Sequence, residues 1–361
     1  MDDRRAGRDL DVALDRHRDR APGYGIGNVY VAVDVNSLHR DEQVAGDDMA
    51  RVVRDPGHLN LTVAVEHGAR AAGEVSQLHY RSEDNRVVIA EIGGRRFEWG
   101  ARTYVMGIVN VTPDSFSGDG LGADAAAAVT QGMRMASEGA DMLDVGGEST
   151  RPGHVPVTAA EEIGRTEVVV RRLARESAVP LSIDTYKQEV AEAGVAAGAT
   201  ILNDVWGLTR SPTIADLAAR NRCALVLMHS QDGTEYPGDL MDEIKRFLVA
   251  AAARAIAAGV PKEKVIVDPG IGFGKTADKN WEVMRRFSEL RELGHPVLVG
   301  TSRKSFIGKL LDLPVTDRLE GTTATVVTAV LRGADIVRVH DVRQMVRAVR
   351  VADRMRRPGS D

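Results

Sequence analysis

Short apolar runs and longer mixed stretches alternate regularly from residue 103 onward. Each apolar run is too short for a globular helix and has the length of a strand that is buried on both faces. The runs predicted as strands are 104–109, 141–145, 181–183, 200–202, 224–228, 265–267, 297–299 and 335–339. Alanine- and charge-rich stretches between them predict helices, for example over 123–138, 159–176, 239–258 and 321–332.

This alternation indicates the fold class. Strands that alternate with helices over about 250 residues match the size of a closed (β/α)₈ barrel. We therefore predict an α/β protein with a TIM barrel over residues 101–361 and an N-terminal extension. An open, doubly wound sheet is the alternative, but no GxGxxG motif follows the first predicted strand.

The residues before the barrel follow other patterns. Arg and Asp dominate residues 1–22 with few apolar groups, which predicts a disordered tail. Residues 23–85 predict a small extension to which the sequence assigns no role. In residues 86–100 two short apolar runs flank Gly93 and Gly94, which indicates a hairpin because glycine tolerates the positive φ of a tight turn. Its position directly before the first barrel strand predicts a cover over the barrel floor.

Composition excludes several classes of protein. The chain has 361 residues, 43% of them hydrophobic, and a net charge of −5. It contains no apolar stretch long enough to span a membrane, no secretory signal and no long basic run, so we expect no membrane and no nucleic-acid partner. The single cysteine, Cys223, excludes a disulfide within the chain and fits a reducing cytoplasm.

Polar residues lie at or shortly after the carboxyl end of each predicted strand. They include Asn110, Glu148, Asp184, Asn203, His229, Asp268, Ser302 and Arg338. Closure of the sheet into a barrel brings the carboxyl ends of all strands to one rim, where barrel enzymes have their active sites. The alternation itself therefore predicts that these side chains converge.

Some of these residues have plain structural explanations. An Asp at a strand end is often a helix N-cap, and for Asp204 this explanation is as good as a site role. His229 could equally be a buried core histidine. Asp184, Asn203 and Asp268 are harder to explain without a ligand, because buried polar groups with unmet hydrogen bonds cost several kcal/mol. Together they suit a flat, nitrogen-rich heterocycle.

The cationic residues point to a second kind of ligand. Arg151, Lys304, Arg338 and His340 come from three loops, and barrel sites often bind phosphate through the loops after strands seven and eight. Lys and Arg that converge on one rim suit a phosphate or a diphosphate. Salt bridges to neighbouring acids are the alternative.

A family resemblance joins both observations. The chain contains, in order, NVTPDSFSGDG, DVGGESTRPG, SIDTYK, ILNDVWG, LMH, VIVDPGIGFGKT, VGTSRKSFIG and VRVHD. These stretches resemble the signatures of the dihydropteroate synthase family over about residues 103–351. The resemblance implies a pterin-binding TIM barrel, usually a homodimer. It also implies condensation of 6-hydroxymethyl-7,8-dihydropterin diphosphate with 4-aminobenzoate, which gives 7,8-dihydropteroate and diphosphate.

The resemblance also implies roles for single residues. The pterin would be bound by Asp184, Asn203, Met228, Asp268, Phe273 and Lys304. Arg338 and His340 would hold the diphosphate, and Asn110 would bind its Mg²⁺. The aminobenzoate site would be formed by Thr150, Arg151, Pro152 and Ser305. The catalytic residues implied are Asp268, Lys304, Arg338 and His340.

Two other functions stay open at this point. A pterin-binding methyltransferase domain shares the barrel and the acidic pterin contacts, but it would require a corrinoid partner. A catalytically silent relative would bind pterin, or a protein partner through its N-terminal extension, without turnover. Release of diphosphate with and without 4-aminobenzoate separates the three possibilities.

Overall fold

The computed structural model describes residues 50–55, 58–65, 88–111, 121–148 and 156–357. The chain divides into two units, residues 1–85 and 86–361. In the first unit β1 (Ala50–Asp55) pairs antiparallel with β2 (His58–Val65). The tail predicted over residues 1–22 lies outside the described residues.

The second unit contains the predicted barrel. Its parallel sheet has eight strands, in the order β10-β9-β8-β7-β6-β5-β12-β11. The strands are β5 (Tyr104–Asn110), β6 (Met142–Gly146), β7 (Leu181–Asp184), β8 (Ile201–Asp204), β9 (Ala224–Met228), β10 (Val265–Asp268), β11 (Leu298–Val299) and β12 (Ile336–Val339). A parallel bridge between Val267 and Val297 joins the two ends of the sheet. The predicted fold class is confirmed.

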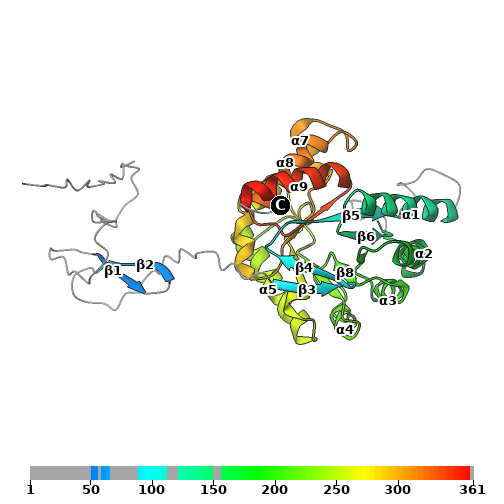
Figure 1. Cartoon of the computed structure of the whole chain (residues 1–361), viewed down its shortest axis with the longest axis horizontal. Helices are drawn as coiled ribbons and strands as arrows, with labels where there is room; N and C mark the ends of the chain where they lie inside the picture. Colours follow the sequence, from blue (N-terminus) through cyan, green and yellow to red (C-terminus); the bar gives the residue numbers. More distant parts are fainter. Residues whose placement is uncertain (1–49, 56–57, 66–87, 112–120, 149–155, 358–361) are drawn as a thin grey trace, which may run out of the picture. The chain divides into compact units, whose positions relative to one another are not determined.

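Helices cover the outer face of the barrel (Figure 1). They are α1 (Leu121–Ser137), α2 (Ala159–Glu176), α3 (Gln188–Ala197), α4 (Ile214–Arg220), α5 (Leu240–Ala257), α6 (Ala277–Arg285), α7 (Ser305–Leu311), α8 (Leu319–Leu331) and α9 (Val342–Arg356), with 3₁₀ turns η2 (Lys262–Lys264) and η3 (Phe287–Leu293). The bounds of α1, α2, α5 and α8 are close to those predicted, and a capping side chain marks the start of two of these helices, α2 and α5. Asp239, for example, accepts hydrogen bonds from the backbone N–H groups of Met241 and Asp242 and so begins α5.

A hairpin packs against the amino end of the barrel strands. β3 (Val88–Ile92) and β4 (Arg95–Trp99) pair around Gly93 and Gly94, whose φ values are +57° and +74°. The buried side chains of the hairpin share one apolar cluster with residues near the start of the barrel strands, including Tyr104, Met106, Met142, Ile201 and Ile336. Trp99 Nε1 also donates to the Glu263 carbonyl at 2.9 Å.

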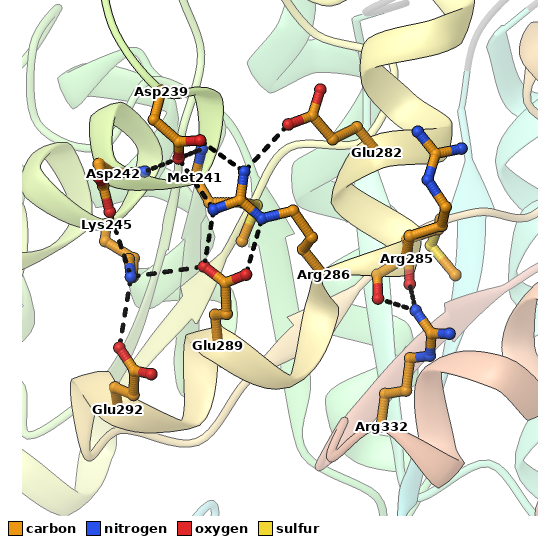
Figure 2. Close-up of polar contacts among 11 residues, drawn as sticks. Asp239, Met241, Asp242, Lys245, Glu282, Arg285, Arg286, Glu289, Glu292 and Arg332 are labelled. Atoms are coloured by element: carbon orange, nitrogen blue, oxygen red, sulfur yellow. Dashed lines mark hydrogen bonds and ion pairs between the residues drawn. The ribbon is translucent and has the colours of Figure 1, made fainter. Parts of the chain in front are cut away.

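An ion-pair network joins α5 to the end of α6 on the surface (Figure 2). Arg286 Nη1 lies 2.6 Å from Asp239 Oδ2 and 3.0 Å from Glu282 Oε1. Arg286 Nε lies 2.7 Å from Glu289 Oε1. Because the network links the start of α5 to α6 and η3, and none of the predicted site residues takes part in it, we assign it to the packing of these segments.

Candidate active site

The alternation of strand residues decides which side chains enter the barrel. Ile201, Ile266 and Ile336 belong to the inner apolar cluster near the hairpin. Side chains two positions further along a strand point to the same face. Asn203 and Arg338 therefore lie one layer above this apolar floor, toward the carboxyl end of the barrel.

The predicted site residues occupy this carboxyl end. Four are the last residues of their strands, namely Asn110, Asp184, Met228 and Asp268. The others in the described part of the chain are Asn203 in β8, Phe273 after β10, Lys304 and Ser305 at the start of α7, Arg338 in β12 and His340 after β12. Thr150, Arg151 and Pro152 lie outside the described residues.

Arg338 connects several of these strands. Its Nε donates to Asp144 Oδ2 at 2.6 Å, and its Nη2 donates to Asp184 Oδ2 at 2.7 Å. The same Asp144 oxygen accepts a hydrogen bond from Asn203 Nδ2 at 2.9 Å. One cation, two carboxylates and one amide thus form a continuous buried network across β6, β7, β8 and β12.

Sequence reasoning missed Asp144. The residue lies in the middle of β6, whose five residues are all buried, and its side chain is 0% exposed. A single acid inside an otherwise apolar strand is a signal, because burial of a carboxylate is unfavourable unless a cation or donors pair with it. The cation, Arg338, is distant in sequence, so the sequence alone does not show the pairing.

Asp184 lies in a low-dielectric setting. Burial raises the pKa of its carboxyl to about 7, Arg338 acts to lower that pKa and the Asp144 carboxylate acts to raise it. Its Oδ1 has no hydrogen-bond partner among the described residues. This oxygen is therefore available to a donor on a ligand.

The loop after β10 fixes Asp268. Asp268 is 6% exposed, and its Oδ1 accepts from the backbone N–H of Gly270 at 2.7 Å. Burial is the largest effect on this carboxyl and raises its pKa. Gly270 has a φ of +69°, and a Cβ there would lie 1.9 Å from the His229 carbonyl oxygen, so only glycine permits this approach.

Lys304 lies against the same loop. Its Nζ donates to the Ile271 carbonyl at 2.8 Å and lies 4.2 Å from the centroid of the Phe273 ring. Burial lowers the pKa of the Lys304 ammonium to about 8, while Asp268 acts in the opposite direction. The contact with the ring is a cation–π interaction.

Ser302 orients His340. The Ser302 Oγ accepts from the backbone N–H of His340 at 3.1 Å and lies 2.9 Å from its ring Nδ1. A serine hydroxyl that donates to Nδ1 fixes the tautomer with a proton on Nε2. This tautomer presents an N–H donor, the group that an anionic oxygen requires.

Lys275 and His229 form a buried pair beneath the loop. Lys275 Nζ lies 2.9 Å from His229 Nδ1 and donates to the carbonyls of Gly270 and Phe273, both at 3.0 Å. Burial lowers the pKa of His229 to about 3 and that of Lys275 to about 7. These contacts support the structural explanation of His229.

Asp204 also has a structural role. Its carboxylate accepts from the backbone N–H groups of Trp206 at 2.8 Å and Leu208 at 2.7 Å. Both oxygens of the Asp204 carboxylate thus hydrogen-bond to the backbone of the loop that follows β8.

A cavity of about 210 Å³ opens between the loops after β6, β7, β8 and β10. Tyr186, Trp206 and Phe273 supply aromatic walls, and Glu148 also lines the cavity. Glu148 pairs with Lys187, whose Nζ lies 2.5 Å from Glu148 Oε2 and 2.6 Å from Glu162 Oε2. Apolar and aromatic side chains form most of its lining, as in small-molecule sites.

Comparison with known proteins matches this geometry to a family. The family model described as "Pterin binding enzyme" matches residues 106–340. A dihydropteroate synthase of Clostridium beijerinckii is 47% identical over 264 residues, which cover 73% of this chain and 98% of the relative. The chain belongs to the dihydropteroate synthase family of pterin-binding enzymes.

Solved structures of dihydropteroate synthases also resemble the chain. The enzyme of Clostridium difficile, solved in the presence of pteroic acid, has a TM-score of 0.70 and 48% identity over 72% of this chain and 99% of its own. The Xanthomonas albilineans synthase with 4-aminobenzoic acid has a TM-score of 0.70 and 43% identity over 74% of this chain and 98% of its own. Among the described helices, none has both the length and the hydropathy of a membrane span.

Proposed function

We propose that this chain condenses 6-hydroxymethyl-7,8-dihydropterin diphosphate with 4-aminobenzoate, and that it releases diphosphate and 7,8-dihydropteroate. One observation carries the proposal: the buried Arg338, Asp144, Asp184 and Asn203 network lies at the carboxyl end of the barrel. Family membership supports it, because relatives with 42–47% identity are dihydropteroate synthases.

The pterin end of the substrate is assigned to three strands. A pterin edge carries adjacent N–H donors and ring nitrogen acceptors, so it suits the carboxylates of Asp184 and Asp268 and the amide of Asn203. The proposed pocket wall is apolar, with Met228 4% exposed. Phe273 and Lys304 complete it, since the ring and the ammonium already lie against each other.

The diphosphate is assigned to Arg338 and His340. Nε and Nη2 of Arg338 are occupied by Asp144 and Asp184, which fixes the plane of the guanidinium. His340 is oriented by Ser302. Both residues would stabilise the negative charge that develops on the leaving oxygen.

Mg²⁺ is assigned to Asn110. Within the described residues no three His, Cys, Asp or Glu side chains form a metal-binding group. The amide oxygen of Asn110, at the end of β5, suits a cation that takes most of its ligands from phosphate and water, as Mg²⁺ does. Mg²⁺ would supply charge neutralisation at the diphosphate when bound.

The chemistry follows from the two reactants. The aromatic amine is uncharged at neutral pH and needs no strong base, so the difficult step is departure of the diphosphate. We assign a dissociative displacement: the C–O bond breaks, its electron pair leaves with the diphosphate, and the amine nitrogen attacks the methylene carbon and then loses a proton. Asp268, buried beside the pterin, would stabilise positive charge on the ring system.

The aminobenzoate is assigned to Thr150, Arg151, Pro152 and Ser305. Ser305 is the first residue of α7 and its side chain is exposed. Its hydroxyl can therefore reach a carboxylate that binds near the start of this helix.

A second copy of the chain is the proposed partner. A cavity of about 300 Å³ lies between α6, α7 and α8, and its lining includes Trp281, Ile307 and Leu310. Leu310 is 65% exposed and Leu311 is 44% exposed, so this face carries an apolar patch. Leu310→Glu with Leu311→Glu should convert a dimer to a monomer in light scattering, whereas Val351→Glu, at a 63% exposed position on α9, should not. A monomeric parent protein would contradict the proposal.

We also propose that the catalytic unit begins near residue 86, with the 86–100 hairpin as the cover of the barrel floor. The match to the Clostridium beijerinckii relative covers 98% of that protein but 73% of this chain, so the relative has no counterpart of most of the extension. Removal of residues 1–85 should leave synthase turnover intact, and loss of turnover would give the extension a catalytic role.

The buried single cysteine, Cys223, fits the proposed cytoplasmic setting.

Product analysis tests the function directly. The chain, incubated with pterin diphosphate, 4-aminobenzoate and Mg²⁺, should form dihydropteroate, detected by mass. Methyl transfer to an added corrinoid protein would favour the methyltransferase alternative. Ligand binding without any product would favour the silent relative.

A further inference from the structure

Asp144 is an acid in the apolar interior of the barrel. Met142 lies in the inner cluster and Leu143 and Val145 lie in the outer one, so strand alternation directs Asp144 into the barrel. Its side chain is 0% exposed, and its Oδ1 has no hydrogen-bond partner among the described residues. A buried carboxylate with one unmet oxygen is costly, which makes a purely packing role a poor explanation.

The other oxygen of Asp144 serves two residues of the proposed site. Oδ2 accepts from Arg338 Nε at 2.6 Å and from Asn203 Nδ2 at 2.9 Å. A carboxylate can only accept, so Asn203 must turn its NH₂ group toward Asp144 and keep its carbonyl oxygen for another partner. The bond to Nε likewise fixes the rotation of the Arg338 guanidinium, whose second contact is Asp184.

We propose that Asp144 is a positioning residue for the condensation, because it sets the guanidinium of Arg338 and the amide of Asn203 in one shared arrangement. Asp144 thereby fixes Arg338, on the side assigned to the diphosphate, together with Asn203, on the side assigned to the pterin. The inference rests on the proposed function, since it takes Arg338 and Asn203 as substrate-binding residues. Asp144 itself need not touch either substrate.

Asp144→Asn tests this role with almost no change in volume. The neutral amide loses the charge opposite Arg338 and turns a donor toward one of its two partners. We expect kcat to decrease about 100-fold, as for misplaced catalytic groups. The Kd of inorganic diphosphate should increase about tenfold, because an Arg338 guanidinium that Asp144 no longer orients makes poorer contacts with the anion. KM for 4-aminobenzoate should change little, because neither partner of Asp144 is assigned to that substrate.

The pH dependence of kcat/KM distinguishes a positioning role of Asp144 from a merely structural one. The groups that act on Asp184 are Arg338, Lys304, Glu162 and Asp144, and Asp144 is one of those that raise its pKa. Removal of this charge should move the acid limb of the kcat/KM profile to lower pH. A loss of activity that came only from local unfolding would leave the limb in place.

Ser182 provides a matched control. It lies opposite Asp144 in the β6–β7 register, is 0% exposed, and its Oγ has no hydrogen-bond partner among the described residues. Ser182→Ala should keep kcat and diphosphate affinity. If Asp144→Asn does not fold, Asp144→Ser provides a smaller side chain with the same loss of charge.

The outcomes are distinct. A folded Asp144 variant with unchanged kcat and diphosphate affinity would overturn the inference while the parent enzyme still forms product. A parent protein that forms no dihydropteroate would instead refute the proposed function. Equal losses in the Asp144 and Ser182 variants would also overturn the inference, because they would show general sensitivity of the buried strands.

Discussion

Arg338 Nε lies 2.6 Å from Asp144 Oδ2, although the two residues are 194 positions apart in the chain. Their strands, β12 and β6, are not neighbours, because β5 lies between them in the sheet. The contact therefore passes over β5 on the inner face of the barrel. The carboxyl end of the barrel interior thus holds a charged network, whereas the end near the hairpin is filled by apolar side chains.

Asp268→Asn should abolish most synthase activity. The carboxylate is buried and held by the Gly270 N–H, and we assign it to the pterin and to positive charge that develops on the ring. Loss of that charge should lower kcat/KM about 100-fold or more, as for removal of one preorganised electrostatic group.

Steady-state kinetics and thermal unfolding of the Asp268→Asn variant check this expectation together. Asp204→Asn is the control, because Asp204 is also a buried acid at a strand end but bonds only within its own loop. The control should lose stability and keep turnover. Near-normal turnover in Asp268→Asn would remove this residue from the mechanism.

Asn110→Ala should weaken the magnesium response. Asn110 ends β5 at the site rim, and its amide oxygen is the protein ligand that we assign to Mg²⁺. Loss of one ligand should raise the Mg²⁺ concentration for half-maximal diphosphate binding about tenfold. Isothermal titration of diphosphate at several Mg²⁺ concentrations measures this shift, and an unchanged response would disprove the assignment.

His229 should make the folded chain sensitive to acid. Burial lowers its pKa in the folded state from 6.5 to about 3. Between these pH values the unfolded chain binds a proton at His229 that the folded chain does not, so the free energy of unfolding decreases as the pH falls through this window.

The contribution of His229 can be isolated by substitution. At pH 5 it should amount to about 2 kcal/mol, relative to pH 7.5. In His229→Gln this part of the acid loss should be absent. Urea unfolding of both proteins at the two pH values gives the comparison, and identical acid losses would show that His229 is protonated in the folded state.

Arg286 should contribute modestly to stability. It pairs with Asp239, Glu282 and Glu289 on the surface between α5 and η3 (Figure 2). Arg286→Met should lower the unfolding temperature by about 2 °C, because exposed ion pairs contribute little. The difference from the parent should shrink in 1 M salt, where charges are screened. A difference that does not depend on salt would mean that packing, not charge, explains the loss.

The fold could be predicted because its signals are local. Each barrel strand is a short apolar run, and capping residues such as Asp239 mark the helix starts. Strand alternation then fixes which residues face inward. The predictions for Asp184, Asn203, Asp268 and Arg338 place them at the carboxyl end of the barrel, where the structure has them.

The partners of buried charged residues could not be predicted from the sequence. The sequence shows Asp144 only as one residue of a predicted strand, because its cation, Arg338, lies on β12 and meets it only when the barrel closes. Lys275 lies in a glycine-rich stretch that gives no local sign of a partner, but in the structure it contacts His229 and two carbonyls of the Asp268 loop. Such contacts between distant segments leave no local pattern in the chain.

The stoichiometry of the reaction tests the central claim most directly. Diphosphate release and 4-aminobenzoate consumption should be measured in one reaction with the full-length chain, pterin diphosphate and Mg²⁺. The account predicts that the two amounts are equal and that omission of 4-aminobenzoate stops sustained release. Continued release of diphosphate without the amine, or consumption of neither substrate, would contradict it.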